Sequence, residues 1–197
     1  MPRIPALEPG RAGLLIRLGY RAARRRFGQV PEPAAVMAHH PRLVMAYGVH
    51  EWLVEGAATR LPAPVRDLVQ HRVATRVGCS WCVDFGTMLA VKAGFTVDRH
   101  RALAHYEGSP LFDDDEKAAL AYADAMTDLP LTVTDEMVAG LRERFGNAGV
   151  IELTYLVALE NLRARANHAL GITAQGYTAG DACPMPFDEQ ISRAARI

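Results

Sequence analysis

Residues 62–94 read PAPVRDLVQHRVATRVGCSWCVDFGTMLAVKAG, and the rest of the chain is best understood outward from them. Prolines open the stretch, where they favour the first turn of a helix. Gly78 and Gly94 stand where glycine favours the ends of two helices. The stretch therefore predicts two helices joined at Gly78, with Cys79 and Cys82 at the start of the second.

Polar side chains lead along the first helix toward the cysteines. Asp67, His71 and Thr75 recur every four residues, so they form one stripe on a helix. Cys79 and Cys82 lie one turn apart at the start of the next helix, where their sulfurs can meet.

A cysteine pair at a helix start favours redox chemistry. Two thiols separated by two residues can form a small disulfide ring, and the positive end of the helix dipole favours thiolate over thiol. The thiol proton also needs an acceptor, and the upstream candidates are Asp67 and His71. The pair therefore predicts thiol–disulfide exchange, with Cys79, Cys82, Asp67 and His71 as the catalytic group.

Two other interpretations of the pair remain open. Paired cysteines also bind zinc, but a structural site needs four donors, and Cys183 stands alone in a proline-bounded tail. We therefore expect no metal and no cofactor. Cys79 and Cys82 would otherwise be small buried core residues. A thioredoxin fold is excluded, because its motif follows a strand and this one follows a helix.

The remaining sequence predicts an all-α bundle with almost no strand signal. Proline, glycine and capping residues divide it into helices of about 10 to 20 residues. Beyond the two helices at the cysteines, helices are expected from 43 to 56, 98 to 106, 113 to before Pro130, near Thr134, and 151 to 170.

The chain divides into one domain with an arm at each end. Residues 1–30 carry seven Arg against one Glu and predict a basic helix or arm. Residues 31–180 form the all-α domain, and residues 181–197 a loosely held arm. The basic helix is expected to pack four apolar side chains onto the body: Leu14, Leu15, Leu18 and Phe27.

Composition excludes several function classes. The chain has 22 Lys and Arg against 22 Asp and Glu among 197 residues, so no nucleic-acid partner is expected. No apolar run approaches the ~20 residues of a membrane-spanning helix, so no membrane contact is expected. Without a signal-peptide core, the protein is expected in the cytoplasm.

The long terminal helix carries charge among Leu, Val and Ala. Glu160, Ala164 and His168 recur every four residues, with Asn161 and Arg165 beside them. Either a buried Glu–Arg network braces the bundle, or this stripe is a substrate-facing wall of the cysteine site.

These features together resemble a known family. An acidic residue precedes the first cysteine by twelve positions, Gly-Cys-x-x-Cys follows at 78–82, and Ala-Gly closes the second helix at 93–94. The pattern over residues 41–94 looks like the alkyl hydroperoxidase D-like, or carboxymuconolactone decarboxylase, superfamily. Residues 160–171, ENLRARANHALG, resemble the end of a longer redox-type branch.

The resemblance implies roles for the thiols and the acid. Cys82 resembles the cysteine that attacks peroxide, Cys79 the resolving thiol, and Asp67 stands at a glutamate relay position. The family's relay histidine, four residues after the second cysteine, is Gly86 here. A histidine sometimes found between the cysteines is Trp81, otherwise most simply a core aromatic residue.

Other side chains are candidates to complete this site. His71, one turn from Asp67, or His168 from the terminal helix would substitute for the missing imidazole. Asp84 projects about 160° away from Cys82 on an ideal helix and ranks lower. The possible pocket residues are Trp81, Asp84, Gly86, Glu160 and His168.

The sequence thus predicts a single all-α domain, homo-oligomeric as the superfamily usually is, with thiol-dependent peroxidase activity. Its partners would be a small-molecule peroxide and an external dithiol reductant. A non-catalytic helical oligomer or small-ligand binding protein is the alternative from another class. A carboxymuconolactone decarboxylase-like enzyme is the weaker alternative, because that branch generally lacks the cysteine pair.

Overall fold

The computed structural model describes residues 1–178, and every regular element within them is a helix. The elements are η1 Pro9–Arg11, α1 Leu14–Phe27, α2 Glu32–Met37, α3 Pro41–Ala57, α4 Ala63–Val77, α5 Ser80–Lys92, α6 Val97–Ala102, η2 Leu103–Gly108, α7 Asp114–Thr127 and α8 Asp135–Leu170. The expected all-α fold is confirmed, and the arm at 181–197 with Cys183 lies outside the described residues. Over residues 1–178, no helix combines the length and apolar character that a membrane span needs.

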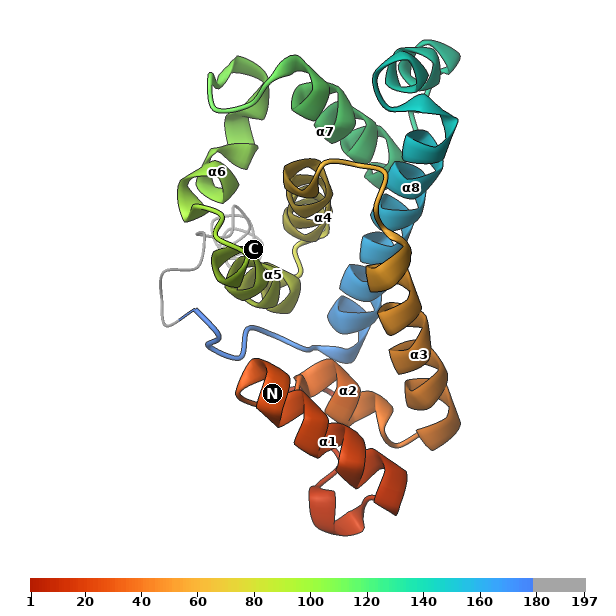
Figure 1. Ribbon diagram of the computed structural model, residues 1–197. Coiled ribbons are helices and arrows are strands. Elements are labelled where there is room, and N and C mark those ends of the chain that lie inside the picture. Colours follow the sequence, from red (N-terminus) through yellow and green to blue (C-terminus); the bar gives the residue numbers. More distant parts are fainter. Residues whose placement is uncertain (179–197) are drawn as a thin grey trace.

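Helix α4 is the centre of the bundle. It packs against α5, α7 and α8, while α6 and η2 connect α5 to α7 (Figure 1). The main core contains side chains that are at most 2% exposed, and their burial is the chief favourable term for the fold. They include Leu68, Val69, Leu103, Leu120, Leu153 and Val157.

A buried ion pair fixes α4 against α7. Arg72 donates from Nε and Nη2 to the two carboxylate oxygens of Asp124, at 2.7 and 2.8 Å. Its Nη1 also donates to the carbonyl oxygen of Leu103 in η2, at 2.9 Å. This two-point geometry defines the rotation of α4 more strictly than apolar contacts alone would.

The corner between α4 and α5 depends on Gly78. Its φ of 81° lies in the left-handed region, which L side chains rarely adopt, and its N–H donates to the carbonyl of Ala74 at 3.0 Å. Cys79 then caps α5, because its Sγ accepts the backbone N–H of Cys82 at 3.1 Å. The predicted helix–corner–helix arrangement is confirmed here.

Helix α8 begins earlier than the longest predicted helix. It runs from Asp135, with a kink at Gly146 where φ is 67° and ψ is 174°. The expected start near Ile151 was wrong because the break falls at Gly146, while Gly149 lies inside the helix. A Cβ at Gly149 would lie 2.6 Å from the Cβ of Phe145, so this close approach requires glycine.

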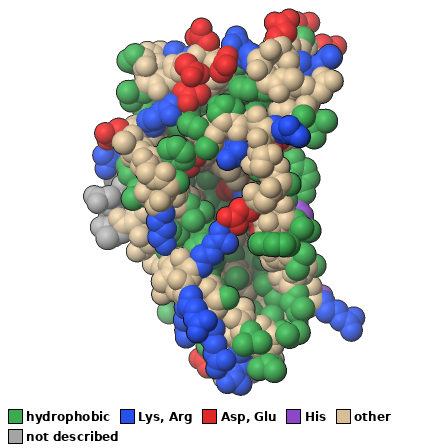
Figure 2. Space-filling view, viewed as in Figure 1, with side chains coloured by type: hydrophobic (Ala, Val, Ile, Leu, Met, Phe, Trp, Pro, Cys, Tyr) green, Lys and Arg blue, Asp and Glu red, His purple; other side chains and the backbone are tan. Residues whose placement is uncertain are grey.

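The N-terminal helix packs with a different face from the one predicted. Leu14, Leu15 and Leu18 are 47–68% exposed, whereas Ile16 and Tyr20 are buried against the α2 segment. The Tyr20 hydroxyl also donates to the carbonyl of Leu7 at 3.0 Å, which helps select this face. Of the four predicted residues, Phe27 does pack onto the body, with its ring edge-on to Phe85 of α5 and the centroids 5.1 Å apart. Basic side chains gather at this end of the molecule, as Figure 2 shows.

A pair of glycine substitutions tests the corner. Gly78→Ala should lower the free energy of unfolding by about 1–2 kcal/mol, because a Cβ disfavours left-handed backbone. Gly140→Ala, inside α8 with open space around its Cβ position, should raise it by about 0.5–1 kcal/mol. Urea denaturation measures both, and equal effects would contradict the role assigned to Gly78.

Candidate redox site

The two motif cysteines are joined at the start of α5. Cys79 and Cys82 form a disulfide with their Cα atoms 5.3 Å apart, as the spacing predicted. Both are buried, at 2% and 7% exposure. They belong to an apolar cluster that also contains Val36, Ala74, Trp81, Val83, Ala164 and Ile172.

Helix α8 brings an amide to both sulfurs. Asn167 Nδ2 lies 3.4 Å from Cys82 Sγ and 3.6 Å from Cys79 Sγ, within hydrogen-bond range for sulfur. The sequence pattern placed His168 on this face, but His168 is exposed and Asn167 is buried. At 100° per residue, position 167 lies about 20° from Glu160 around the helix, and position 168 about 80°.

Asp67 and His71 belong to a buried cluster with a histidine that sequence reasoning missed. His100 of α6 contacts Asp67 Oδ2 through Nε2 at 2.6 Å, and its ring stacks on His71 with centroids 3.8 Å apart. His100 belongs to no motif, so its position gave no signal in the sequence. Only the packing of α6 near α5 brings it to α4.

The His71 imidazole occupies the space beside Gly86. A Cβ built on Gly86 would lie 3.7 Å from His71 Nδ1, an ordinary contact distance. Gly86 is one helical turn beyond Cys82, so this imidazole lies along the α5 face that carries the cysteine. His71 therefore lies beside the position at which the sequence lacked a histidine.

His71 is neutral at ordinary pH. Burial and the neighbouring charge of His100 lower its pKa to about 3. Neither ring nitrogen of His71 has a hydrogen-bond partner among the described residues, although both are buried. Such nitrogens are costly to bury and are available for hydrogen bonds with a ligand or a neighbouring thiol.

Asp84 and Trp81 hold a segment that we call the strap, residues 172–178, across the start of α5. The Asp84 carboxylate accepts the backbone N–H groups of Gln175, Tyr177 and Thr178, each at 3.0 Å. The Trp81 indole donates to Gln175 Oε1 at 2.8 Å. Both side chains therefore anchor the strap at the start of α5, and Ile172 of the strap belongs to the apolar cluster of the cysteines.

Glu160 belongs to an ion-pair network rather than to the cysteine cluster. Arg163 donates to Glu160 at 3.0 Å, to Gln70 at 2.9 Å and to both carboxylate oxygens of Glu51. Burial outweighs the nearby guanidinium and raises the pKa of Glu160 to about 7. The network joins α3, α4 and α8, as the bracing interpretation predicted.

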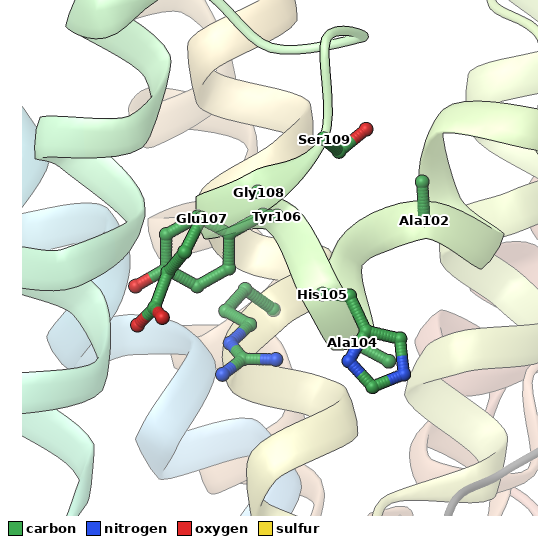
Figure 3. A pocket seen from close by; sticks show the side chains of 8 residues that line it. Ala102, Ala104, His105, Tyr106, Glu107, Gly108 and Ser109 are labelled. Carbon is green, nitrogen blue, oxygen red and sulfur yellow. The ribbon is translucent and has the colours of Figure 1, made fainter.

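A separate pocket of about 650 Å³ lies along η2, where Arg72 of α4 faces it (Figure 3). Arg72, His105, Tyr106 and Ser109 are among its lining residues, and the cysteines are not. The Arg72 guanidinium is already paired with Asp124. No group of three or more His, Cys, Asp or Glu suited to a metal ion occurs within residues 1–178.

Comparison with known proteins finds relatives in sequence and similar folds among solved structures. The Carboxymuconolactone decarboxylase family model matches residues 38–125. The uncharacterized protein YnjA of Escherichia coli is 35% identical over 153 residues, covering 78% of this chain and 84% of YnjA.

Two solved structures share the fold at low sequence identity. The alkylhydroperoxidase AhpD core of a peroxidase-related protein from Ralstonia eutropha has a TM-score of 0.79 at 18% identity, covering 93% of this chain and 97% of its own. The debrominase Bmp8 has a TM-score of 0.77 at 19% identity, covering 89% and 94%. At such identities the likeness concerns the fold alone.

The strap predicts how Asp84 affects access to the disulfide. In Asp84→Asn, one amide NH₂ would oppose the backbone donors of the strap, and charge-assisted hydrogen bonds would be lost. The strap should then open more easily, so dithiothreitol should reduce the disulfide about tenfold faster. Asp98→Asn, at an exposed aspartate of α6, is the control, and a folded Asp84→Asn variant with the parental rate would contradict the anchor role.

Proposed function

Because the chain belongs to the alkyl hydroperoxidase D-like, or carboxymuconolactone decarboxylase, superfamily, we propose that it is a thiol-dependent oxidoreductase that reduces peroxides. The observation that carries this proposal is the Cys79–Cys82 disulfide at the start of α5, with the imidazole of His71 beside Gly86. A structural role for the disulfide alone would leave unexplained the buried His71 ring, neither nitrogen of which is hydrogen-bonded within residues 1–178.

The proposed reaction begins with the reduced pair. The Cys82 thiolate attacks one peroxide oxygen, the O–O bond breaks, and the released alkoxide, or hydroxide from hydrogen peroxide, takes up a proton and leaves as alcohol or water. Cys82 is then a sulfenic acid. The Cys79 thiol attacks its sulfur, water leaves, and the disulfide forms; an external dithiol reduces it and is itself oxidised to a disulfide.

The neighbouring side chains have distinct roles in this proposal. The lowered pKa of His71 means that its ring does not store a proton; the neutral imidazole instead passes the Cys82 proton to the leaving oxygen in one concerted step, accepting at one nitrogen and donating from the other. His100 holds the His71 ring by stacking, and Asp67 orients His100 through the 2.6 Å contact. The positive end of the α5 dipole favours the thiolate. Asp67 thus acts through His100 in this scheme.

Kinetics with the reduced protein test the proposal. Cys82→Ser should abolish peroxide consumption, and Cys79→Ser should permit one turnover that ends at a sulfenic acid, which dimedone traps. His71→Asn should slow the reaction about 10²-fold through loss of acid–base assistance. His105→Asn, at an exposed histidine outside the cluster, is the matched control.

The outcomes separate this function from its alternatives. Since His71 is buried, circular dichroism must show a folded variant, and Asp67→Asn gives a second test of the same relay. A parent protein that forms the disulfide but consumes no hydrogen peroxide or cumene hydroperoxide would favour the ligand-binding alternative. Turnover of a lactone acid without participation of the cysteines would favour the decarboxylase-like alternative.

We further infer that a second copy of the chain covers α3. No residue of this 17-residue helix is buried, and hydrophobic side chains gather over it (Figure 2). Five of its apolar residues are 46–69% exposed: Leu43, Met45, Val49, Trp52 and Leu53. Glu51 and Glu55 are paired with Arg163 and Arg26, so the surface carries few uncompensated charges. Two identical charged surfaces would repel each other, because like charges would meet. A surface with few uncompensated charges is therefore suited to contact with an identical surface.

Light scattering after gel filtration tests the second copy. The parent should be at least dimeric, and Trp52→Glu should produce a monomer, because two charges would be buried against each other. Leu131→Glu, equally exposed but beyond α7, should leave the mass unchanged. A monomeric parent, or a Trp52→Glu variant with the parental mass, would contradict the interface.

A further inference from the structure

We propose that Asn167 is a positioning residue that stabilises the Cys82 thiolate through its side-chain amide. The proposal rests on the redox role proposed for the cysteine pair, and it adds a group from the other end of the chain. Asn167 is 4% exposed, and its Nδ2 reaches both sulfurs, at 3.4 Å for Cys82 and 3.6 Å for Cys79.

The backbone holds Asn167 in this position. Gly171, with φ of 66°, ends α8, and the N–H of Ile172 donates to the carbonyl of Asn167 at 2.9 Å. Arg3 donates to the carbonyls of His168 and Ala169, which are also at the helix end. One turn before Asn167, the fully buried Ala164 lets α8 approach the cysteine cluster closely. The fixed end of α8 therefore holds the Asn167 side-chain amide toward the two sulfurs.

The sulfurs of Cys79 and Cys82 differ in the hydrogen-bond donors that reach them. Cys79 Sγ already accepts the N–H of Cys82 as the cap of α5. The hydrogen bond recorded at Cys82 Sγ within residues 1–178 comes from Asn167. An N–H donor interacts weakly with a disulfide sulfur and strongly with a thiolate, because the thiolate is charged. Asn167 consequently favours the reduced, ionised state of Cys82.

The titratable groups around Cys82 are neutral or paired with other groups. From α4, His71 faces α5 and is neutral. From α8, Glu160 lies on the same helix face as Asn167 and is paired with Arg163. On α5, Asp84 is occupied by the strap, which also places Tyr177 nearby. Within residues 1–178 no Lys or Arg donates a hydrogen bond to Cys82 Sγ, so a neutral amide is a significant donor here.

The test compares two substitutions with opposite electrostatics. Asn167→Leu removes the donor, and Asn167→Asp replaces it with a carboxylate that repels the thiolate. Asn161→Leu is the control, because Asn161 lies on the same helix but donates to Thr127 and Val157. Iodoacetamide labelling of the reduced protein between pH 5 and 10, read by mass spectrometry at Cys82, gives the thiol pKa.

The expected order of Cys82 pKa is parent lowest, Asn167→Leu about one unit higher and Asn167→Asp higher still. One unit is a tenfold loss of thiolate at a given pH below both pKa values. Equilibration with glutathione should show the disulfide of Asn167→Leu about tenfold more stable at pH values where the parent thiol is ionised, or ~30 mV more negative in potential.

These outcomes are independent of peroxide turnover. If the pKa order holds while the parent consumes no peroxide, the role of Asn167 stands and the proposed substrate fails. If the thermal midpoint falls in both variants but the pKa of Cys82 is unchanged, Asn167 is only a packing residue and the inference is overturned. It is equally overturned if Asn161→Leu shifts the pKa as much as Asn167→Leu.

Discussion

The left-handed backbone of Gly78 is the constraint on which the redox site depends. With φ of 81°, this residue ends α4 and turns the chain directly into α5, so Cys79 becomes the cap of the second helix. The same turn places α4 beside α5, which brings His71 next to Gly86. A longer connection would separate the imidazole from the helix face that carries Cys82. One glycine therefore sets both the position of the thiols and the imidazole that lies along their helix.

Around this corner, three segments enclose the disulfide from different directions. Helix α4 supplies the His71 ring, which the His100–Asp67 pair supports through ring stacking. Helix α8 supplies the Asn167 amide, and the strap closes over the start of α5. The polar groups in this apolar setting have distinct tasks: a neutral base, a neutral donor and a carboxylate that holds backbone.

Local sequence rules predicted the helices, but for several of them they did not predict which face is buried. Proline, glycine and capping residues mark helix ends through backbone geometry, which needs no knowledge of distant contacts. Which side of a helix becomes buried depends on its neighbours. Thus α1 buries Ile16 and Tyr20 against α2 and exposes Leu14, although both faces offer apolar residues. Likewise, the four-residue repeat from Glu160 suggested that His168 faces the cysteines, whereas in the structure Asn167 faces them.

The sequence by itself determined the all-α class, the corner at Gly78 and the adjacency of Cys79 and Cys82, because these follow from local backbone preferences. It also identified Asp67 and His71 as neighbours on one helix stripe. Only the tertiary structure decided that His100 joins them, that Asn167 reaches the sulfurs and that Asp84 holds the strap. These contacts link residues 29 to 94 positions apart, and no local pattern encodes the packing that brings such residues together.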